Sequence, residues 1–190
     1  MEHRFVPIRL RIPLIPAMKV LEAASYLGGL VSLVLIVIQL RADAAQRRTQ
    51  TAFEFVRQFG NSPMSDHRAV LLRMWLPYSD QLAVINQQGM PEKEIAALIE
   101  LVLTEVDKQT SPNGVVAIHE IADFYDQLLI CEESGACDPK VIRNYFSSYG
   151  HSFRCLYQKV VEAQAAATGA PDLGKGIREI GGSAPCTRAG

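Results

Sequence analysis

Several patterns that would reveal a function are missing from this sequence of 190 residues. Charged residues make up 21% of the chain, and 19 Lys and Arg residues balance 20 Asp and Glu residues. A nucleic-acid-binding protein needs an excess of basic residues on one surface, so nucleic acid is not an expected partner. With 48% hydrophobic residues, the chain also has too much apolar surface to stay disordered over its whole length.

Motifs of known chemistry are absent as well. The sequence has no glycine-rich phosphate loop, no Gly-x-Ser-x-Gly turn and no Ser/His/Asp set at a recognisable spacing. His119 and Asp123 share one helix face, but a zinc-binding helix needs a second His at position 123, and two ligands do not complete a metal site. We therefore predict no catalytic, cofactor-binding or metal-binding residue, and an enzyme is disfavoured. The alternative is a membrane-bound enzyme or metal-binding domain with a dispersed site, built from residues such as His119, Asp123 and Tyr125.

Cysteine is scarce, with four residues at positions 131, 137, 155 and 186. A disulfide-rich secreted scaffold would carry more cysteines in a shorter chain, so the number leaves the compartment open. Cys131 and Cys137 flank a predicted turn between two helices, and a disulfide between them would close a short loop. We expect that disulfide if the domain faces an oxidising compartment, and buried free thiols if it faces the cytosol.

Charge is also absent from residues 23 to 38, which form the longest apolar stretch. As a helix that rises ~1.5 Å per residue, residues 20 to 40 would span about 31 Å, close to the roughly 30 Å hydrocarbon core of a bilayer. We therefore predict an N-terminal tail at residues 1–17 and a single transmembrane helix at residues 18–40, surrounded by membrane lipid. The alternative is a signal peptide cleaved near Ala42-Asp43-Ala44, which would release a secreted helical protein.

The positive charges beside this segment do not decide its orientation. Four basic residues precede it and four follow it: Arg4, Arg9, Arg11 and Lys19, then Arg41, Arg47, Arg48 and Arg57. If translation begins at Met18, Lys19 alone remains on the amino side, and the positive-inside rule then places the rest of the chain in the cytoplasm. We expect this cytoplasmic orientation.

Beyond the membrane segment, apolar residues recur with the 3.6-residue period of helices, and no stretch alternates as a β-strand would. Helices are predicted at residues 45–60, 66–75, 80–88, 91–106, 115–134 and 139–160. Asp138 is a predicted N-cap, Pro139 suits the first turn, and Gly150 interrupts the last helix. The predicted fold is thus all-α, with one transmembrane helix, a small helical bundle at residues 41–165 and a disordered tail at residues 166–190, where Ala, Gly, Pro and Ser dominate.

Arg68, Arg73 and Trp75 lie on the short helix that ends at Trp75. Arg and Trp often anchor protein interfaces, so these three are the candidate interaction residues, although the single Trp of a small domain more often lies in its core. The anchor, the bundle and the missing catalytic set together predict a membrane-tethered helical interaction or accessory protein. Its expected partner is another protein or a second copy of the chain.

The order of these features resembles a known family. The spanning helix is followed by Arg47-Arg48-Thr49-Gln50-Thr51, by Arg68 and Trp75 in a short helix, and by residues 118–125 and 138–146. This order is similar to the bacterial membrane-anchored proteins grouped as domain of unknown function 4760, over residues 20 to 165. The resemblance implies a membrane-anchored helical domain and no assigned activity.

Overall fold

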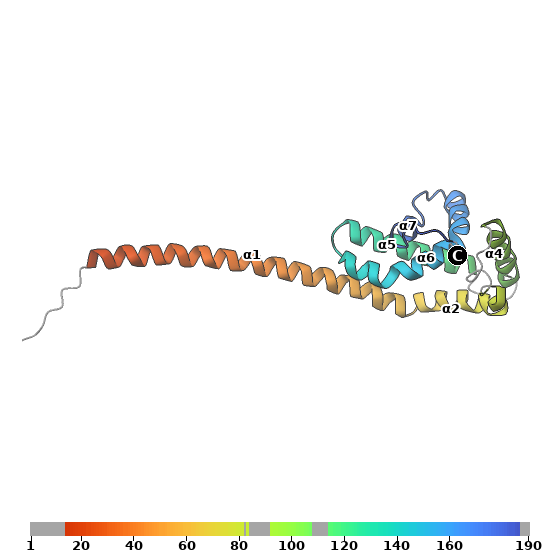
Figure 1. Cartoon of the computed structure of the whole chain (residues 1–190), viewed down its shortest axis with the longest axis horizontal. Coiled ribbons are helices and arrows are strands. Elements are labelled where there is room, and N and C mark those ends of the chain that lie inside the picture. Colours follow the sequence, from red (N-terminus) through yellow and green to blue (C-terminus); the bar gives the residue numbers. More distant parts are fainter. Residues whose placement is uncertain (1–13, 82, 84–91, 108–113, 187–190) are drawn as a thin grey trace, which may run out of the picture. The chain divides into compact units, whose positions relative to one another are not determined.

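The computed structural model describes residues 14–81, 83, 92–107 and 114–186 (Figure 1). Within these ranges it contains helices and no strand, which confirms the predicted all-α fold. The elements are α1 (Leu14–Gly60), α2 (Met64–Trp75), the 3-10 helix η1 (Leu76–Tyr78), α4 (Glu92–Asp107), α5 (Gly114–Glu133), α6 (Pro139–Thr168) and α7 (Lys175–Ile180). Most of the predicted tail at 1–17 and most of the predicted helix at 80–88 lie outside the described residues.

The chain divides into two compact units, residues 1–44 and residues 45–190. Helix α1 contributes residues 14–44 to the first unit and residues 45–60 to the second. It begins at Leu14, four residues before the predicted start of the membrane helix. Pro16 is compatible with this earlier start, because the N–H groups of the first helical turn have no partner within the helix.

The apolar part of α1 is exposed on all sides in the first unit. Of the described helices, one is long and apolar enough to cross a membrane, and no residue of its most apolar stretch is buried. Large side chains such as Tyr26, Leu30 and Leu40 are all more than 60% exposed. A helix that is apolar all round must be buried in protein or in lipid. A membrane-spanning helix has this property, and so does a signal sequence near an amino end.

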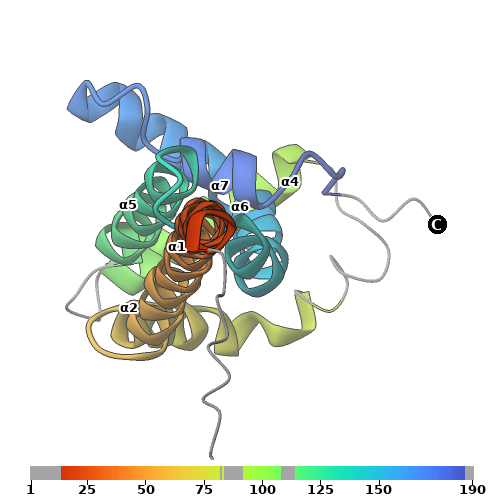
Figure 2. The same ribbon diagram turned by 90° about the vertical axis from the view of Figure 1, so that its left-hand side faces the viewer.

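Helix α5 is the centre of the second unit. Helices α2, α6 and α7 all contact it, and Figures 1 and 2 show α6 and α7 beside it. Its buried residues include large side chains on several sides of the helix, namely Ile118, Ile121, Phe124, Tyr125, Leu128 and Leu129. An apolar surface this wide is expected for a helix that packs against several neighbours.

Asp138 caps α6 and joins it to the part of α1 that belongs to the second unit. Its carboxylate accepts hydrogen bonds from the N–H of Lys140 at 2.9 Å and from the hydroxyl of Thr49 at 3.1 Å. The N–H of Asp138 donates to the carbonyl oxygen of Arg48 at 3.1 Å. The predicted N-cap is confirmed, with Pro139 in the first turn.

Residues 166–186 differ from the predicted disordered tail. Helix α6 continues to Thr168 and ends at Gly169, whose φ of 67° is the left-handed conformation that glycine favours. Helix α7 follows, and the buried hydrophobic side chains of this segment are Leu173, Ile177 and Ile180. Their spacing of four and three residues is that of an amphipathic helix, a signal that the small-residue composition of the segment masks. Residues 187–190 lie outside the described residues.

Helix α7 lies unusually close to α5. The carboxylate of Asp126 accepts hydrogen bonds from the N–H groups of Gly174 at 2.7 Å and Gly176 at 2.6 Å. Burial raises the pKa of Asp126, and these two hydrogen bonds oppose that rise. A Cβ atom added to Gly176 would lie 1.9 Å from the carbonyl oxygen of Tyr125, so no side chain fits at this position without moving the backbone.

We predict that Gly176→Ala lowers the free energy of unfolding by at least ~2 kcal/mol, because α7 must move away from α5 and lose the two hydrogen bonds to Asp126. The measurement is thermal unfolding of the full-length protein in detergent, followed by circular dichroism. Gly60→Ala is the matched control, since nothing lies within 4 Å of its added Cβ atom and the expected change is within about 0.5 kcal/mol. Equal effects of the two substitutions would contradict the close packing of α7.

Candidate functional site

An apolar groove lies between α2 and α6 in the second unit. Both helices pack against α5, and the space left between them has a volume of about 520 Å³. This size lies in the range of roughly 300–1,000 Å³ that is usual for ligand pockets. Its walls are Ser65, Arg68, Ala69, Leu71, Leu72 and Trp75 from α2, and Tyr149, Ser152, Phe153, Leu156 and Tyr157 from α6. The side chain of Leu72 is 64% exposed, so the groove presents apolar surface to its surroundings.

Arg68 brings a positive charge to this groove, and aromatic rings hold it there. Its guanidinium carbon lies 4.4 Å from the ring centroid of Phe59 and 5.4 Å from that of Tyr149. Its Nη1 donates a hydrogen bond to the carbonyl oxygen of Phe59 at 3.2 Å. Burial raises the pKa of Tyr149, and the positive charge of Arg68 offsets part of that rise. Cation–π contacts of this kind fix the position of a guanidinium group without neutralising it.

The charge of Arg68 has no acidic partner within the described part of the chain. Its Nε atom is buried without a hydrogen-bond partner, and no described carboxylate forms an ion pair with its guanidinium group. A partly buried cation is most stable beside an anion. The groove is therefore electrostatically suited to a ligand that brings a negative charge.

Trp75 and Tyr157 connect the two walls of the groove. Both side chains are buried, and the indole Nε1 of Trp75 donates a hydrogen bond to the hydroxyl oxygen of Tyr157. Burial raises the pKa of Tyr157, so its hydroxyl stays protonated at neutral pH. Trp75 thus belongs to the core and also lines the groove.

The structure brings together two of the three predicted interaction residues. Arg68 and Trp75, seven residues apart, line the groove, whereas Arg73 is exposed and its Nε donates to the carbonyl oxygen of Ala69 in the same helix. Five residues separate Arg68 from Arg73, a rotation of roughly 140° around a helix with 3.6 residues per turn. The spacing of apolar residues in the sequence did not identify α6 as a wall of the groove. Tyr149, Phe153 and Tyr157 recur every four residues, and this spacing is equally typical of a helix face that packs in a core.

The residues of the alternative dispersed site lie in different surroundings. Tyr125 is buried and its hydroxyl donates to the carbonyl oxygen of Phe146 at 2.8 Å. Asp123 is exposed and accepts a hydrogen bond from Gln127 at 2.7 Å, and His119 is half-buried. Within the described ranges, no three His, Cys, Asp or Glu side chains gather as a metal site would require.

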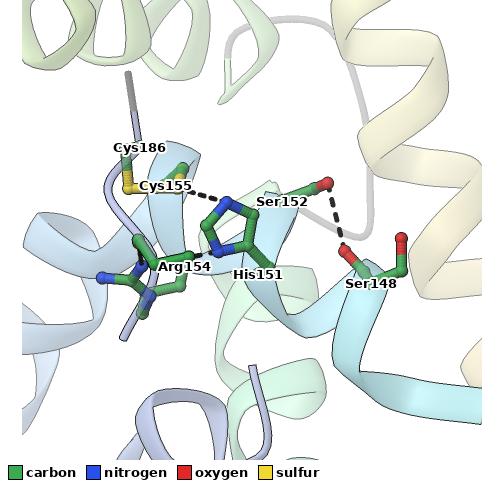
Figure 3. Close-up of a disulfide and its surroundings, with 7 residues drawn as sticks. Ser148, His151, Ser152, Arg154, Cys155 and Cys186 are labelled. Carbon is green, nitrogen blue, oxygen red and sulfur yellow. Dashed lines mark hydrogen bonds between the residues drawn. A yellow bond between two sulfur atoms is a disulfide. The ribbon is translucent and has the colours of Figure 1, made fainter. Parts of the chain in front are cut away.

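All four cysteines form disulfides in the structure. Cys131 is joined to Cys137, the pair that the sequence suggests for an oxidising compartment, across the turn between α5 and α6. Cys155 of α6 is joined to Cys186, in the segment after α7 (Figure 3). In both pairs the Cα atoms are 5.3 Å apart, a usual distance for a disulfide.

Comparisons with known proteins give no match for this chain. No family model matches it, and no curated protein or solved structure matches it either. The resemblance to the domain of unknown function 4760 family therefore stays a prediction. The function of the groove has to be argued from its own geometry.

We predict that Tyr157→Phe lowers the free energy of unfolding by about 1–3 kcal/mol, because it leaves the buried indole N–H of Trp75 without an acceptor. The measurement is denaturant unfolding followed by the fluorescence of Trp75, the one Trp in the sequence. Tyr145→Phe removes an exposed hydroxyl from the same helix and should change the free energy by less than about 0.5 kcal/mol. No difference between the variants would show that the Trp75–Tyr157 hydrogen bond does not support the groove.

Proposed function

We propose that this chain is a single-pass membrane protein whose helical domain acts as an accessory subunit, and that it binds a partner protein through the groove between α2 and α6. The observation that carries this proposal is the charge of Arg68 in an apolar groove, where no carboxylate of the described residues pairs with it. The exposed apolar surface of α1 supports the membrane anchor, since only lipid or protein can cover it.

The groove fits an apolar segment that carries one carboxylate. Leu72 and Leu156 offer apolar contacts on opposite walls, and Arg68 lies on the same surface. A guanidinium group binds a carboxylate through two parallel hydrogen bonds, which gives direction as well as affinity. An amphipathic helix laid into a groove between two helices uses this combination of an apolar face and one charged anchor. We therefore propose an amphipathic helix with an Asp or Glu on its apolar face as the occupant.

We further propose that the helical domain lies on the oxidising side of the membrane. The pairing of all four cysteines supports this orientation, because disulfides persist in oxidising compartments and are rare in the cytosol. The cytoplasmic orientation depends on a start at Met18, because the basic residues on the two sides of the apolar segment are equal in number in the full sequence.

We predict that photo-crosslinkers placed at Leu72 and at Ser152 in native membranes capture the same protein, because these two residues lie on opposite walls of the groove. Mass spectrometry of the adducts should map both to one segment with an acidic residue, and Arg68→Glu should reduce the yield at least about tenfold, which corresponds to ~1.4 kcal/mol of binding free energy. Ile130, 65% exposed on α5 and outside the groove, is the matched control position. Adducts with a second copy of this chain would replace the partner protein with a homo-oligomer, and an equal yield from Arg68→Glu would refute the role of the charge.

We predict that the full-length protein stays in the membrane pellet after alkaline carbonate extraction, because its apolar helix is embedded in lipid. An Asn144→Cys probe, at an exposed position of α6, should react with a membrane-impermeant maleimide in intact cells, before any permeabilisation. Labelling that requires permeabilised cells would place the domain in the cytoplasm. A soluble product that lacks its amino end would instead indicate a cleaved signal peptide.

A further inference from the structure

The two disulfides of the domain differ in their accessibility. Cys131 and Cys137 are buried, with exposed fractions of 8% and 1%. Cys155 is half-buried and Cys186 is exposed. Thiol–disulfide exchange begins when a thiolate reaches one of the two sulfur atoms, so access decides which disulfide reacts. The Cys155–Cys186 disulfide is open to this attack and the Cys131–Cys137 disulfide is protected from it.

Two side chains of α6 form a hydrogen-bond chain that ends at the Cys155–Cys186 disulfide (Figure 3). Nη2 of Arg154 lies 3.5 Å from Nδ1 of His151, and Nε2 of His151 lies 3.7 Å from Sγ of Cys155. Arginine has only N–H donors, so Nδ1 of His151 is the acceptor in the first contact. A disulfide sulfur has no proton to donate, so Nε2 of His151 is the donor in the second. The chain of contacts thus directs an N–H group at Sγ of Cys155.

The N–H group that His151 directs at Sγ makes Cys155 the better leaving group of the two cysteines. When a disulfide is cleaved, one sulfur receives the new bond and the other leaves as a thiolate. A thiolate on Cys155 would accept a hydrogen bond from Nε2 of His151, whose other ring nitrogen contacts Arg154, and a hydrogen bond to the charged form stabilises negative charge on sulfur. Cys186 is the more exposed of the two residues and is therefore the sulfur that a reagent reaches first.

We propose that Cys155–Cys186 is a thiol–disulfide exchange site that is opened by a dithiol reductant. One thiolate of the dithiol attacks Sγ of Cys186, a mixed disulfide forms between them, and Cys155 leaves as a thiolate that takes a proton from solvent. The second thiol of the reductant, once deprotonated, attacks the reductant's first sulfur in the mixed disulfide. This attack releases Cys186 as a thiolate, which is then protonated. The protein gains two electrons and two protons, and the dithiol becomes a disulfide. This inference does not depend on the proposed partner of the groove.

Opening this disulfide would release the end of the chain from α6 and leave α7 in place. Helix α7 keeps the hydrogen bonds of Gly174 and Gly176 to Asp126, which do not involve the disulfide. The described part of the segment after α7 would keep a side-chain hydrogen bond to α6, in which Arg154 donates to the carbonyl oxygen of Ala184. The exchange site therefore controls a short exposed segment, while the core and the α2–α6 groove stay intact.

The first test is a comparison of the two disulfides in the full-length protein in detergent. The protein is treated with a low concentration of dithiothreitol, free thiols are alkylated at timed intervals, and each cysteine is quantified by peptide mass spectrometry. Cys155 and Cys186 should become reactive at least about tenfold faster than Cys131 and Cys137, because access sets the rate. Equal rates, or reduction of both pairs only in denaturant, would overturn the proposal.

The second test uses glutathione, a monothiol whose mixed disulfide persists until a second glutathione attacks it, so the adduct is trapped by acid quenching at early times. We expect the glutathione adduct on Cys186, with Cys155 as the free thiol. His151→Ala should remove the preference for an adduct on Cys186 and slow the reaction several-fold. Ser148→Ala, on the turn of α6 that precedes His151, should change neither the preference nor the rate. Selectivity between two sulfurs would not change if His151 had only a structural role. An adduct on Cys155, or a His151→Ala variant that behaves like the wild type, would overturn the assigned direction of attack.

Discussion

The close approach of two helices, α6 and α7, to Tyr125 and Asp126 of α5 fixes the arrangement of the second unit. The Tyr125 hydroxyl donates to the carbonyl oxygen of Phe146 in α6, and a Cβ atom on Gly150 would lie 2.8 Å from the Tyr125 ring. On the α7 side, Gly176 lies against the backbone of the same two residues. Glycine at positions 150 and 176 lets two helices approach one tyrosine, so the positions of α6 and α7 depend on the absence of two side chains. Each candidate site has a wall or a sulfur on α6, and therefore depends on this packing.

The same packing explains why the groove and the exchange site remain separate. Tyr149, Phe153 and Tyr157 line the groove at intervals of four residues, while His151 and Cys155 lie four residues apart on another face of the same turns. Residues two positions apart on a helix point about 200° from each other, so one stretch of α6 serves two surfaces. A change at one surface can leave the backbone of the other undisturbed as long as Gly150 keeps its contact with Tyr125.

Local patterns predict the parts of this structure that depend on neighbouring residues. The all-α fold follows from the helical period of the apolar residues, and the start of α6 follows from Asp138 and Pro139, because capping is local chemistry. Gly150 was expected to interrupt a helix, yet α6 runs through it, since its role is contact with a residue 25 positions earlier. Helix α7 and the partner of Cys155 were missed for the same reason. Both depend on contacts with α5 or α6, and composition does not reveal such contacts.

Arg68 and Arg154 stand out when the charges near the core are considered together. Three described acidic groups that contact other elements have partners within the chain: Asp126 and Asp138 accept backbone N–H groups, and Oε1 of Glu132 pairs with Arg143 at 2.6 Å. Arg68 and Arg154 are half-buried, and in the described ranges each has carbonyl, ring or imidazole partners and no carboxylate. A buried charge of this kind adds little to stability, and an apolar side chain of similar size would often serve the fold as well. The cation at Arg68 is consistent with the proposed binding of a carboxylate, and the cation at Arg154 with the proposed role of His151, which it contacts, at the Cys155 sulfur.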